Sequence, residues 1–501
     1  MSLGAAIGLK ARATKVLERS EPFDGEFRSV VTFGRPKESS AALNQKCEML
    51  YEAEKSDFTL ALAGDCMLTR RLSVFKEDRF QSLVQLLRGA DAAFANLETT
   101  VHTWDEGTPG ITQGTFMTTD PRLLEDLKWL GINLVSCANN HAFDYGEGGI
   151  LATIRHLEEA GLAHAGSGKN LAEARAPGYL DTPNGRVGLI AATAAFRQWN
   201  QAGEQRPDLK GRPGINPLGY QTTYGVDATA FEELRRMSRE LGFDIGKERN
   251  RRHFYSSKEI PDEKEAELVV LGNRFVLDKS FAITTEPNQR DLEQNLRWIR
   301  EARRQADWVI ASLHCHEFGG KSLLQAKSRA DLEETADFVV TFAHEAIDAG
   351  ADLFVGHGSH FPLGIEIYNG RPIFYSVGNF IFQNETVGFF PADAYERFDL
   401  DMKSTPSDFL DARTSAGTKG HPSEAVYWEN MVALCQFRKK SLTQIRLYPI
   451  DQGHGRPRPQ RGRPLLAERE VSDRVLERVR RLSQRYGTQV SNRDGVGFIE
   501  L

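Results

Sequence analysis

The chain has 501 residues, of which 40% are hydrophobic and 26% are charged, and its formal net charge is −6. These values are typical of a globular protein and exclude a disordered or fibrous chain. The length exceeds what one hydrophobic core normally supports, so we expect one large domain with additions, or two domains. The weakly negative charge gives no reason to expect nucleic acid as a partner.

The cysteine content and the hydropathy of the chain indicate its cellular compartment. Five cysteines without paired spacing favour a reducing compartment over a disulfide framework. We expect Cys66, Cys137 and Cys315 to be buried and inert, because free cysteine behaves mostly as a small hydrophobic residue. The apolar stretch at residues 3–9 is too short for a secretory signal, and no apolar run is long enough to span a membrane. We therefore predict a cytoplasmic protein with no integral membrane segment.

The order of the predicted elements indicates an α/β fold. Residues 1–56 are charged and are predicted to form an N-terminal extension with a helical stretch at 40–55. From Asp57 onward strands alternate with helical patterns, which predicts a substantially parallel sheet. Helices are expected at residues 73–87, 120–131, 147–160, 288–305, 330–349 and 471–486, and strands at 162–165, 187–193, 371–376, 426–437 and 444–449.

Two segments depart from this alternation. Residues 196–273 are rich in Pro, Gly and charge, and we predict a loop-rich insert that carries one or two helices, placed at 228–241. We expect 57–385 to form the main domain and 386–501 a C-terminal extension with strands of the second sheet and a terminal helix.

The C-terminal extension contains a cluster of closely spaced arginines, which are Arg456, Arg458, Arg461 and Arg463. These arginines are candidates for binding an anionic substrate, with a solvent-exposed tail as the alternative.

Polar residues follow directly after several strand-like apolar runs. The runs at 58–63, 92–95, 134–137, 308–313 and 353–355 are followed by Asp65, Glu98, Asn140, His314 and His357. Because the carboxyl ends of strands in an α/β sheet border one crevice, we expect these side chains to converge there. The sequence therefore predicts a functional site at this edge.

The residue types at this edge indicate a metal site. Carboxylate, amide and imidazole groups form a mixed oxygen and nitrogen set suited to manganese, zinc or iron. The candidate ligands are Asp65, Glu98, Asn140, His314, His357 and His360. For Asp65 and Glu98 a turn or a helix cap is the alternative, and for His314 a buried core histidine. Because side chains alternate along a strand, His314 and His316 are expected to point to the same side. One imidazole is expected to bind the metal, and the other to contact that ligand without binding the metal itself.

The run from Asn139 to Gly146 adds an acid/base group to the predicted metal site. The amide of Asn140 can bind a cation, and the adjacent imidazole of His141 can transfer protons. Asp144 can orient that imidazole and fix its tautomer. We therefore assign His141 and Asp144 as the candidate catalytic residues.

Six sequence blocks carry a resemblance to a known family. They are Gly64-Asp65, Asn96-Leu97-Glu98, Asn139 to Gly146, Ser312-Leu313-His314, Gly350-Ala351-Asp352 with Gly356-His357, and Tyr375 to Phe380. Over about residues 57–383 the chain resembles the CapA, or poly-γ-glutamate capsule-biosynthesis, family, which is similar to the calcineurin-like metallophosphoesterases. The resemblance implies a four-layer α/β/β/α sandwich of the metallophosphatase type with a metal site at one edge.

The resemblance also implies roles for single residues. Asn140 matches the asparagine ligand of the phosphoesterases and His141 their proton-transferring histidine. His314 matches their mid-chain ligand, and His357 and His360 stand at their C-terminal pair. The chain departs from the pattern where Ala61-Leu62-Ala63 replaces an Asp-x-His pair, where Glu98 replaces a bridging aspartate, and in the spacing of the last two histidines. We therefore expect one divalent metal ion and not two.

Three functions remain open at this point. The first is a metal-dependent hydrolase of phosphoester or γ-glutamyl amide bonds, linked to capsule or poly-γ-glutamate metabolism. The second is a metal-assisted peptide epimerase that uses the same site. The third is a non-enzymatic accessory protein for the synthesis of an anionic polymer. The expected substrate is an anionic polymer, a peptide or a phosphoester, and a synthase complex is the candidate protein partner. We expect no nucleic acid partner.

Overall fold

The computed structural model describes residues 56–111, 114–253 and 265–501. The helix expected at residues 40–55 lies outside the described residues, as does nearly all of the predicted N-terminal extension. Within the described ranges no helix is long and apolar enough to cross a membrane.

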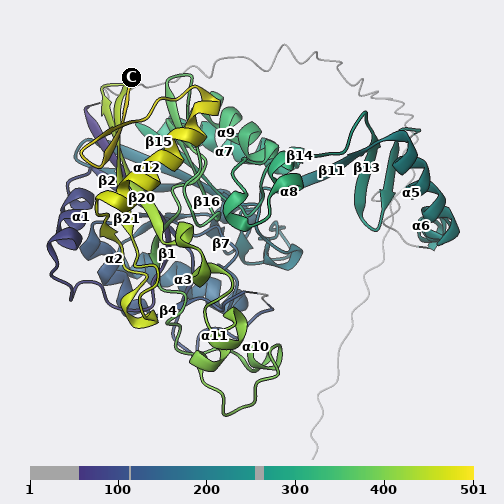
Figure 1. The fold of residues 1–501 in the computed structure, drawn as a ribbon, viewed down its shortest axis with the longest axis horizontal. Coiled ribbons are helices and arrows are strands. Elements are labelled where there is room, and N and C mark those ends of the chain that lie inside the picture. Colours follow the sequence, from purple (N-terminus) through teal and green to yellow (C-terminus); the bar gives the residue numbers. More distant parts are fainter. Residues whose placement is uncertain (1–55, 112–113, 254–264) are drawn as a thin grey trace, which may run out of the picture. The chain divides into compact units, whose positions relative to one another are not determined.

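A ten-stranded sheet forms the first β-layer of the domain (Figure 1). Its strands are β1 (Phe58–Met67), β2 (Ala92–Leu97), β5 (Leu134–Ser136), β6 (Ala163–Ala165), β19 (Asn379–Phe382), β20 (Glu429–Arg438), β21 (Ser441–Asp451), β22 (Leu465–Leu466), β23 (Ser491–Arg493) and β24 (Val496–Glu500). The order is β23-β24-β21-β20-β1-β2-β5-β6, with β19 also paired to β1 and β22 to β21. Strands β1, β2, β5 and β6 run parallel, as the alternation of strands and helices predicts.

A six-stranded sheet forms the second β-layer. Its strands are β8 (Gly178–Thr182), β9 (Gly185–Thr193), β15 (Trp308–His314), β16 (Leu353–His357), β17 (Ile365–Tyr368) and β18 (Arg371–Phe374), in the order β17-β18-β16-β15-β9-β8. Strands β9, β15, β16 and β18 are parallel, so their carboxyl ends share one edge.

Alternating side chains on the strands produce the layers. On β1, Leu60 and Leu62 belong to the core between the two sheets, where Trp308 and Ile310 of β15 also lie. Ala61 of the same strand belongs to the core on the outer side of the sheet. Because successive side chains of a strand point to opposite faces, each sheet buries both of its faces. Each large apolar side chain buried in this way contributes about 1.5–3 kcal/mol.

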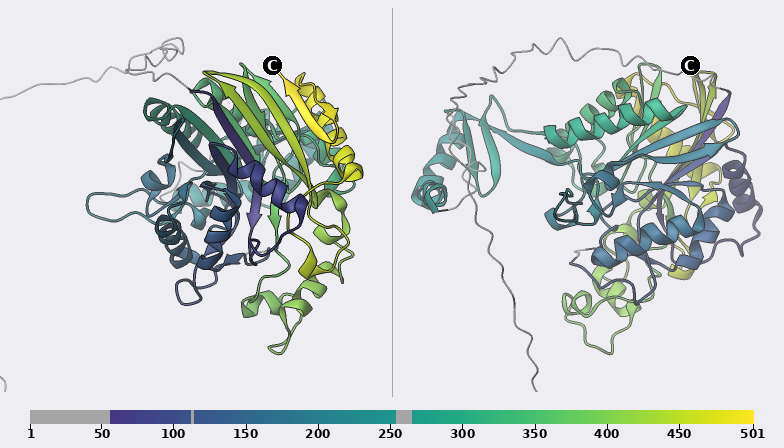
Figure 2. Two further views of the ribbon diagram at one scale, coloured as in Figure 1. Left: turned by 90° about the vertical axis from the view of Figure 1, so that its left-hand side faces the viewer. Right: turned by 180° about the vertical axis from the view of Figure 1, so that it is seen from behind.

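Helices cover both outer faces. On the ten-stranded sheet, α1 (Asp78–Arg88), α2 (Leu124–Leu130) and α3 (Gly146–Ala160) bury leucines against the small side chains of β1 and β2. On the six-stranded sheet, α7 (Gln289–Gln305) and α9 (Asp337–Asp348) pack on Val309, Ala311 and Leu313 of β15. Figure 2 shows α7 and α3 on opposite sides of the two sheets. The architecture is thus the expected four-layer α/β/β/α sandwich of the metallophosphatase type.

Short elements complete the described chain. They are β3 (Thr100–Val101), β4 (Thr118–Thr119), β7 (Ser167–Gly168), α4 (Leu171–Arg175), β10 (Gly214–Ile215), α8 (Gly320–Gln325), α10 (Ala392–Glu396), α11 (Pro406–Thr414) and α12 (Arg469–Ser483). Helix α12 is the expected terminal helix. It buries Val475, Leu476 and Val479 at the end of the inner core, while its arginines Arg474, Arg480 and Arg481 pair with glutamates on the outside.

The 196–273 segment holds a helix at the predicted position and a second one after it, but it also contributes strands that the sequence does not predict. It contains α5 (Ala228–Glu240) and α6 (Phe243–His253) together with β11 (Tyr220–Val226) and β12 (Glu267–Val270). These strands form a four-stranded sheet with β13 (Asn273–Leu277) and β14 (Ala282–Pro287), in the order β12-β13-β11-β14. The small core of this sheet holds Val226, Phe231, Leu268 and Val270. With so few apolar positions, the strands carry little of the alternation by which a strand is recognised in a sequence.

The C-terminal hairpin also differs from expectation. Strands β20 and β21 were expected in a second sheet, but β20 pairs antiparallel with β1, with Phe58 opposite Phe437, and so belongs to the first sheet (Figure 2). Without β20 the main chain of β1 would be an open edge, and buried backbone groups need partners. The hairpin therefore extends the sheet that carries Asp65.

Candidate metal centre

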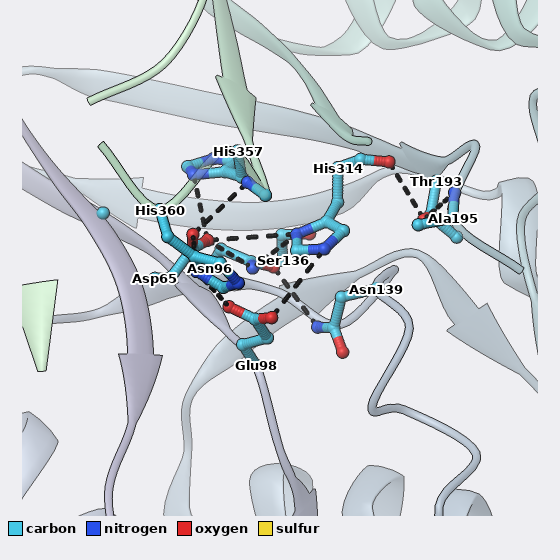
Figure 3. A network of polar contacts seen from close by, with 12 residues as sticks. Asp65, Asn96, Glu98, Ser136, Asn139, Thr193, Ala195, His314, His357 and His360 are labelled. Carbon is cyan, nitrogen blue, oxygen red and sulfur yellow. Dashed lines mark hydrogen bonds and ion pairs between the residues drawn. The ribbon is translucent and has the colours of Figure 1, made fainter. Parts of the chain in front are cut away.

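The predicted ligands meet where the carboxyl ends of strands from both sheets adjoin (Figure 3). Asp65 lies near the end of β1, Glu98 directly follows β2, and the loop after β5 carries Asn140 and His141. From the other sheet, His314 ends β15 and is in register with His357, which ends β16. The sequence prediction of convergence at one edge agrees with this arrangement.

The side chains are close enough to share a cation. Asp65 Oδ1 lies 3.6 Å from His357 Nδ1 and 3.9 Å from His314 Nδ1, and Asp65 Oδ2 lies 3.5 Å from His360 Nδ1. Glu98 lies 3.8 Å from His314 Nε2 and 3.9 Å from His141 Nε2. Two sets of three residues each offer ligand atoms within 4.8 Å of one another: Asp65, Glu98 and His314, and Glu98, His316 and His360. The two sets overlap at Glu98.

Several donor atoms of this cluster are buried and lack a partner. Both carboxylate oxygens of Glu98, both ring nitrogens of His357 and the Oδ1 of Asn140 are buried and make no hydrogen bond within the described ranges of the chain. Buried polar groups in folded proteins are nearly always hydrogen-bonded, and a buried carboxylate without a partner is costly. A divalent cation would satisfy oxygen and nitrogen atoms of this kind, so the residues present fit the expected metal.

The electrostatics of the cluster also suit a cation. Burial, together with the nearby charges of Asp65 and Asp144, raises the pKa of Glu98 well above its usual value. Burial lowers the pKa of His357 to about 4 and that of His316 to about 3. The imidazoles are therefore neutral at physiological pH, which is the form that binds metals. A positive charge at this position would relieve the repulsion on Glu98.

Two histidines have their tautomers fixed by neighbours. The Asn379 amide nitrogen donates to the carbonyls of His360 and Tyr427, so its Oδ1 accepts the Nδ1–H of His360 at 3.0 Å. This leaves the Nε2 lone pair of His360 available as a ligand. His141 Nδ1 lies 2.6 Å from Asp144 Oδ2, which leaves His141 Nε2 for proton exchange. Asp144 thus orients His141, as the sequence predicts.

Glycine at two positions allows the backbone to bring these residues together. A Cβ on Gly64 would lie 1.7 Å from the carbonyl oxygen of Gly378, so only glycine permits the close approach that lets Asp65 N donate to that carbonyl. Gly358 has φ +96° and packs against the Cys315 carbonyl. His360 itself has φ +67°, an uncommon value for a residue with a side chain and one that recurs at functional sites.

The structure places His316 at the site and adds residues that sequence reasoning did not assign to it. His316 Nε2 lies 3.3 Å from His314 Nε2, in line with the predicted alternation, and His316 belongs to one of the two ligand sets. The Asn96 amide donates a hydrogen bond to Asp65 Oδ1 at 2.8 Å. Its position two residues before Glu98 in the sequence could have indicated that Asn96 belongs to the site. His421 packs against the His360 ring with centroids 5.1 Å apart. No sequence signal marks His421, because it stands alone in a loop of the C-terminal extension.

A large cavity opens beside the cluster. It has a volume of about 1230 Å³. Asn140, Asp144 and His316 line it on the side of the metal centre, and Tyr220 lines it from β11. Arg175, Arg197 and Arg290 also line it, and Arg175 is paired with Asp291 at 2.9 Å. The site is therefore reached from a space larger than the 300–1,000 Å³ typical of pockets for small ligands.

The cysteines beside the site are not reactive groups. Cys66 and Cys137 are buried, and burial raises the pKa of Cys137 to about 12. Cys315 is partly buried, and burial raises the pKa of its thiol as well. Thiols held in the protonated form are poor nucleophiles, which agrees with the prediction that they are inert.

Comparison with known proteins supports the family that the fold and site indicate. The family model for the bacterial capsule synthesis protein PGA_cap matches residues 59–384. A Sinorhizobium fredii protein, the uncharacterised y4sH, is 36% identical over 456 residues, which cover 89% of this chain and 93% of that protein. Folded as a four-layer α/β/β/α sandwich with a candidate metal centre at its edge, the chain belongs to the bacterial capsule synthesis (PGA_cap) family.

Two more distant relatives have names that state a function. The PGA biosynthesis protein CapA of Bacillus subtilis is 24% identical over 328 residues, or 64% of this chain and 62% of that protein. A probable polyglutamine synthesis accessory protein of Mycobacterium tuberculosis is 23% identical over 299 residues, or 60% of this chain and 57% of that protein. The assignment to a capsule-biosynthesis family thus stands on the family model and on both of these relatives.

Proposed function

We propose that the chain is a metal-dependent hydrolase of phosphoester or γ-glutamyl amide bonds that acts in capsule or poly-γ-glutamate metabolism. The observation that supports it most is the set of buried, unpartnered atoms on Glu98, Asn140 and His357. A single manganese, zinc or iron ion would be held by Asp65, Glu98, Asn140, His314, His357 and His360. When bound, such an ion supplies Lewis-acid polarisation of a carbonyl or phosphoryl oxygen.

His141 is the proposed proton-transfer group. Its Nδ1–H is held by Asp144, whose Oδ2 also accepts a hydrogen bond from Met117 N at 2.8 Å. This leaves Nε2 as the position where the imidazole exchanges a proton, 3.9 Å from Glu98 Oε1. A histidine oriented in this way can remove a proton from the attacking group and deliver one to the leaving group.

The cavity supports a chain-like substrate. Its volume of about 1230 Å³ exceeds the usual range for small ligands and leaves room for several residues of a polymer or peptide. Arg290 is exposed at its wall, and Arg197 lies over the Trp199 ring at 5.6 Å. Guanidinium groups pair with carboxylates and with phosphates, so an anionic substrate suits this wall.

An accessory role without catalysis is the second candidate. It is favoured by the similarity to the Mycobacterium tuberculosis relative, which is named a probable polyglutamine synthesis accessory protein. In that role the same sandwich would bind an anionic polymer or a synthase and would need neither a metal nor His141.

The variant His141→Ala separates the candidates. We expect elemental analysis to find about one metal ion per chain in both the variant and the wild type. Turnover of bis(p-nitrophenyl) phosphate or γ-glutamyl p-nitroanilide should fall by about 10²–10⁴-fold, because general acid–base catalysis is lost. The matched control is His253→Ala, which removes an exposed histidine of α6 and should change neither value.

Three outcomes would contradict the hydrolase. Metal content at background in the wild type, or equal turnover in His141→Ala, would favour the accessory role. Deuterium uptake from solvent into a recovered peptide, without a new amine or phosphate, would indicate the peptide epimerase. Two ions per chain would contradict the single-ion centre while leaving the hydrolase in place.

A further inference from the structure

A second cavity, of about 290 Å³, shares no lining residue with the cavity at the metal centre. We call it the arginine pocket, and its lining residues are Arg70, Phe75, Glu77, Gln383, Arg456, Pro459, Gln460, Arg461 and Arg463. They come from the loop after β1, the residue after β19 and the segment before β22. The arginine-rich segment that the sequence marks as a candidate anion-binding segment therefore lies against the loop after β1 and the residue after β19.

Positive charge in the arginine pocket exceeds negative charge. Arg461 makes a bidentate ion pair with Glu385 at 2.5 and 2.6 Å, and Arg463 makes one with Glu77 at 2.6 Å for both bonds. These two guanidinium groups are thus neutralised within the chain. Arg70 and Arg456, by contrast, make no ion pair with a carboxylate among the residues that the structure describes, although the charge of Arg456 contributes to the lowered pKa of Glu77.

Arg70 is held in place without being neutralised. Its guanidinium donates to Thr386 Oγ1 at 3.1 Å, to the Arg461 carbonyl at 2.9 Å and to the Pro459 carbonyl. These acceptors are uncharged. Burial and the charge of Arg463 lower the pKa of Arg70, as expected for two cations held close together. The fold therefore fixes a guanidinium group at a position where only an external anion would complete its charge balance.

Gln383 supplies an independent sign of a missing ligand. The residue is 2% exposed, and its Oε1 accepts hydrogen bonds from Thr69 N and Arg70 N, both at 2.9 Å. This fixes which end of the amide carries the nitrogen. The amide nitrogen has no hydrogen-bond partner in the described part of the chain, and Gln383 lines the pocket. A nearly buried donor is thus available next to Arg70.

We propose that the arginine pocket binds a phosphate group. Apart from Glu77, which Arg463 already occupies, the polar side chains that line it are donors, and they come from separate segments of the chain. Phosphate offers more acceptor oxygens and more charge than a carboxylate, and arginine pairs with it through parallel N–H bonds. The ligand is inorganic phosphate or the phosphoryl group of a small molecule that fits the remaining volume.

Titration calorimetry with inorganic phosphate tests the proposal on the full chain as purified. We expect Arg456→Ala to weaken one phosphate-binding event by about tenfold or more, because a hydrogen bond to a charged group is lost. Arg456 is exposed and makes no ion pair with a described residue, so its removal should leave the thermal unfolding temperature unchanged. Arg493→Ala is the matched control, since it removes an arginine that pairs with Glu500 outside the pocket.

A second variant and a second ligand sharpen the result. Gln383→Glu keeps the acceptor for Thr69 and Arg70 but adds a negative charge, so phosphate binding should be lost. Tighter binding of ribose 5-phosphate than of inorganic phosphate would identify a phosphorylated small molecule as the ligand, and the reverse order would identify free phosphate. The proposal is overturned if the wild type binds no phosphate, if binding is equal in Arg456→Ala, or if glutamate binds and phosphate does not.

Discussion

Glu98 and Glu385 are both buried carboxylates, but among the described residues Glu385 has hydrogen-bond partners and Glu98 has none. Glu385 is bound by both arms of Arg461, and Arg458 lies a further 3.5 Å away. Glu98 has charged neighbours but no hydrogen bond to either oxygen. Burial of a charge is therefore not in itself a sign of function in this protein. The sign is a buried charge whose partners within the described chain are incomplete.

The largest expected effect comes from Glu98→Gln, which removes the charge and keeps the shape. Activity should fall by about 100-fold or more, with a matching loss of bound metal, because Glu98 lies in both ligand sets. In chelator-treated protein the same change should not lower the free energy of unfolding, since an unsatisfied carboxylate is removed. Full metal content and full activity in the variant would show that Glu98 is not a ligand.

The next effect comes from Arg461→Ala, which removes both hydrogen bonds from Arg461 to the buried carboxylate of Glu385 and leaves it only the more distant guanidinium of Arg458. The free energy of unfolding should fall by about 3–5 kcal/mol, measured by urea denaturation. Replacing both Glu385 and Arg461 by methionine should recover most of that loss, because no buried charge then lacks a partner. A loss below about 1 kcal/mol in the single variant would mean that this pair behaves like an exposed one.

The smallest effect is a pH dependence at Glu77. A hydrogen bond from Arg463 lowers the pKa of Glu77 below its usual value of 4.5. The contribution of the Glu77–Arg463 ion pair to the free energy of unfolding is therefore complete above about pH 4.5 and is lost as the pH falls through the lowered pKa of Glu77. Because the Glu77 side chain is 49% exposed, Glu77→Gln should cost only a few tenths of a kcal/mol at pH 7. In urea denaturation the difference between the variant and the wild type should shrink as the pH falls below about 4.5, and a difference that grows on acidification would contradict this assignment.

The sequence predicts the parallel α/β arrangement and its edge because both depend on local patterns, whereas the four-layer sandwich is what the family resemblance implies. An apolar run followed by a polar residue marks the end of a buried strand, as at His314 and His357, and parallel strands bring such ends together. The positions of helix termini also depend on the local sequence. Asp120 accepts a hydrogen bond from Arg122 N, and Gly131 ends α2 with φ +102°, as expected for these residue types.

The features that the sequence does not predict depend on distant contacts or on weak patterns. Nothing near Phe437 shows that it pairs with Phe58, because that register is set by residues at the other end of the domain. The helix expected at 330–349 begins only at Asp337, after a short helical turn at Arg329–Asp331. His421 reaches the metal centre only through the path of the C-terminal chain.

The position of β1 in its sheet has a consequence for biosynthesis. Its neighbours are β2, which follows within the next few dozen residues, β19, which pairs with the carboxyl end of β1, and β20, whose Phe437 lies opposite Phe58. At a translation rate of about 5–20 residues per second, the ribosome needs roughly 20–75 s to reach that partner. During this time the hydrogen-bonding groups on one side of β1 stay open, and an open strand edge invites aggregation. Nascent chains that stop before Glu429 should therefore be recognised by chaperones through this edge.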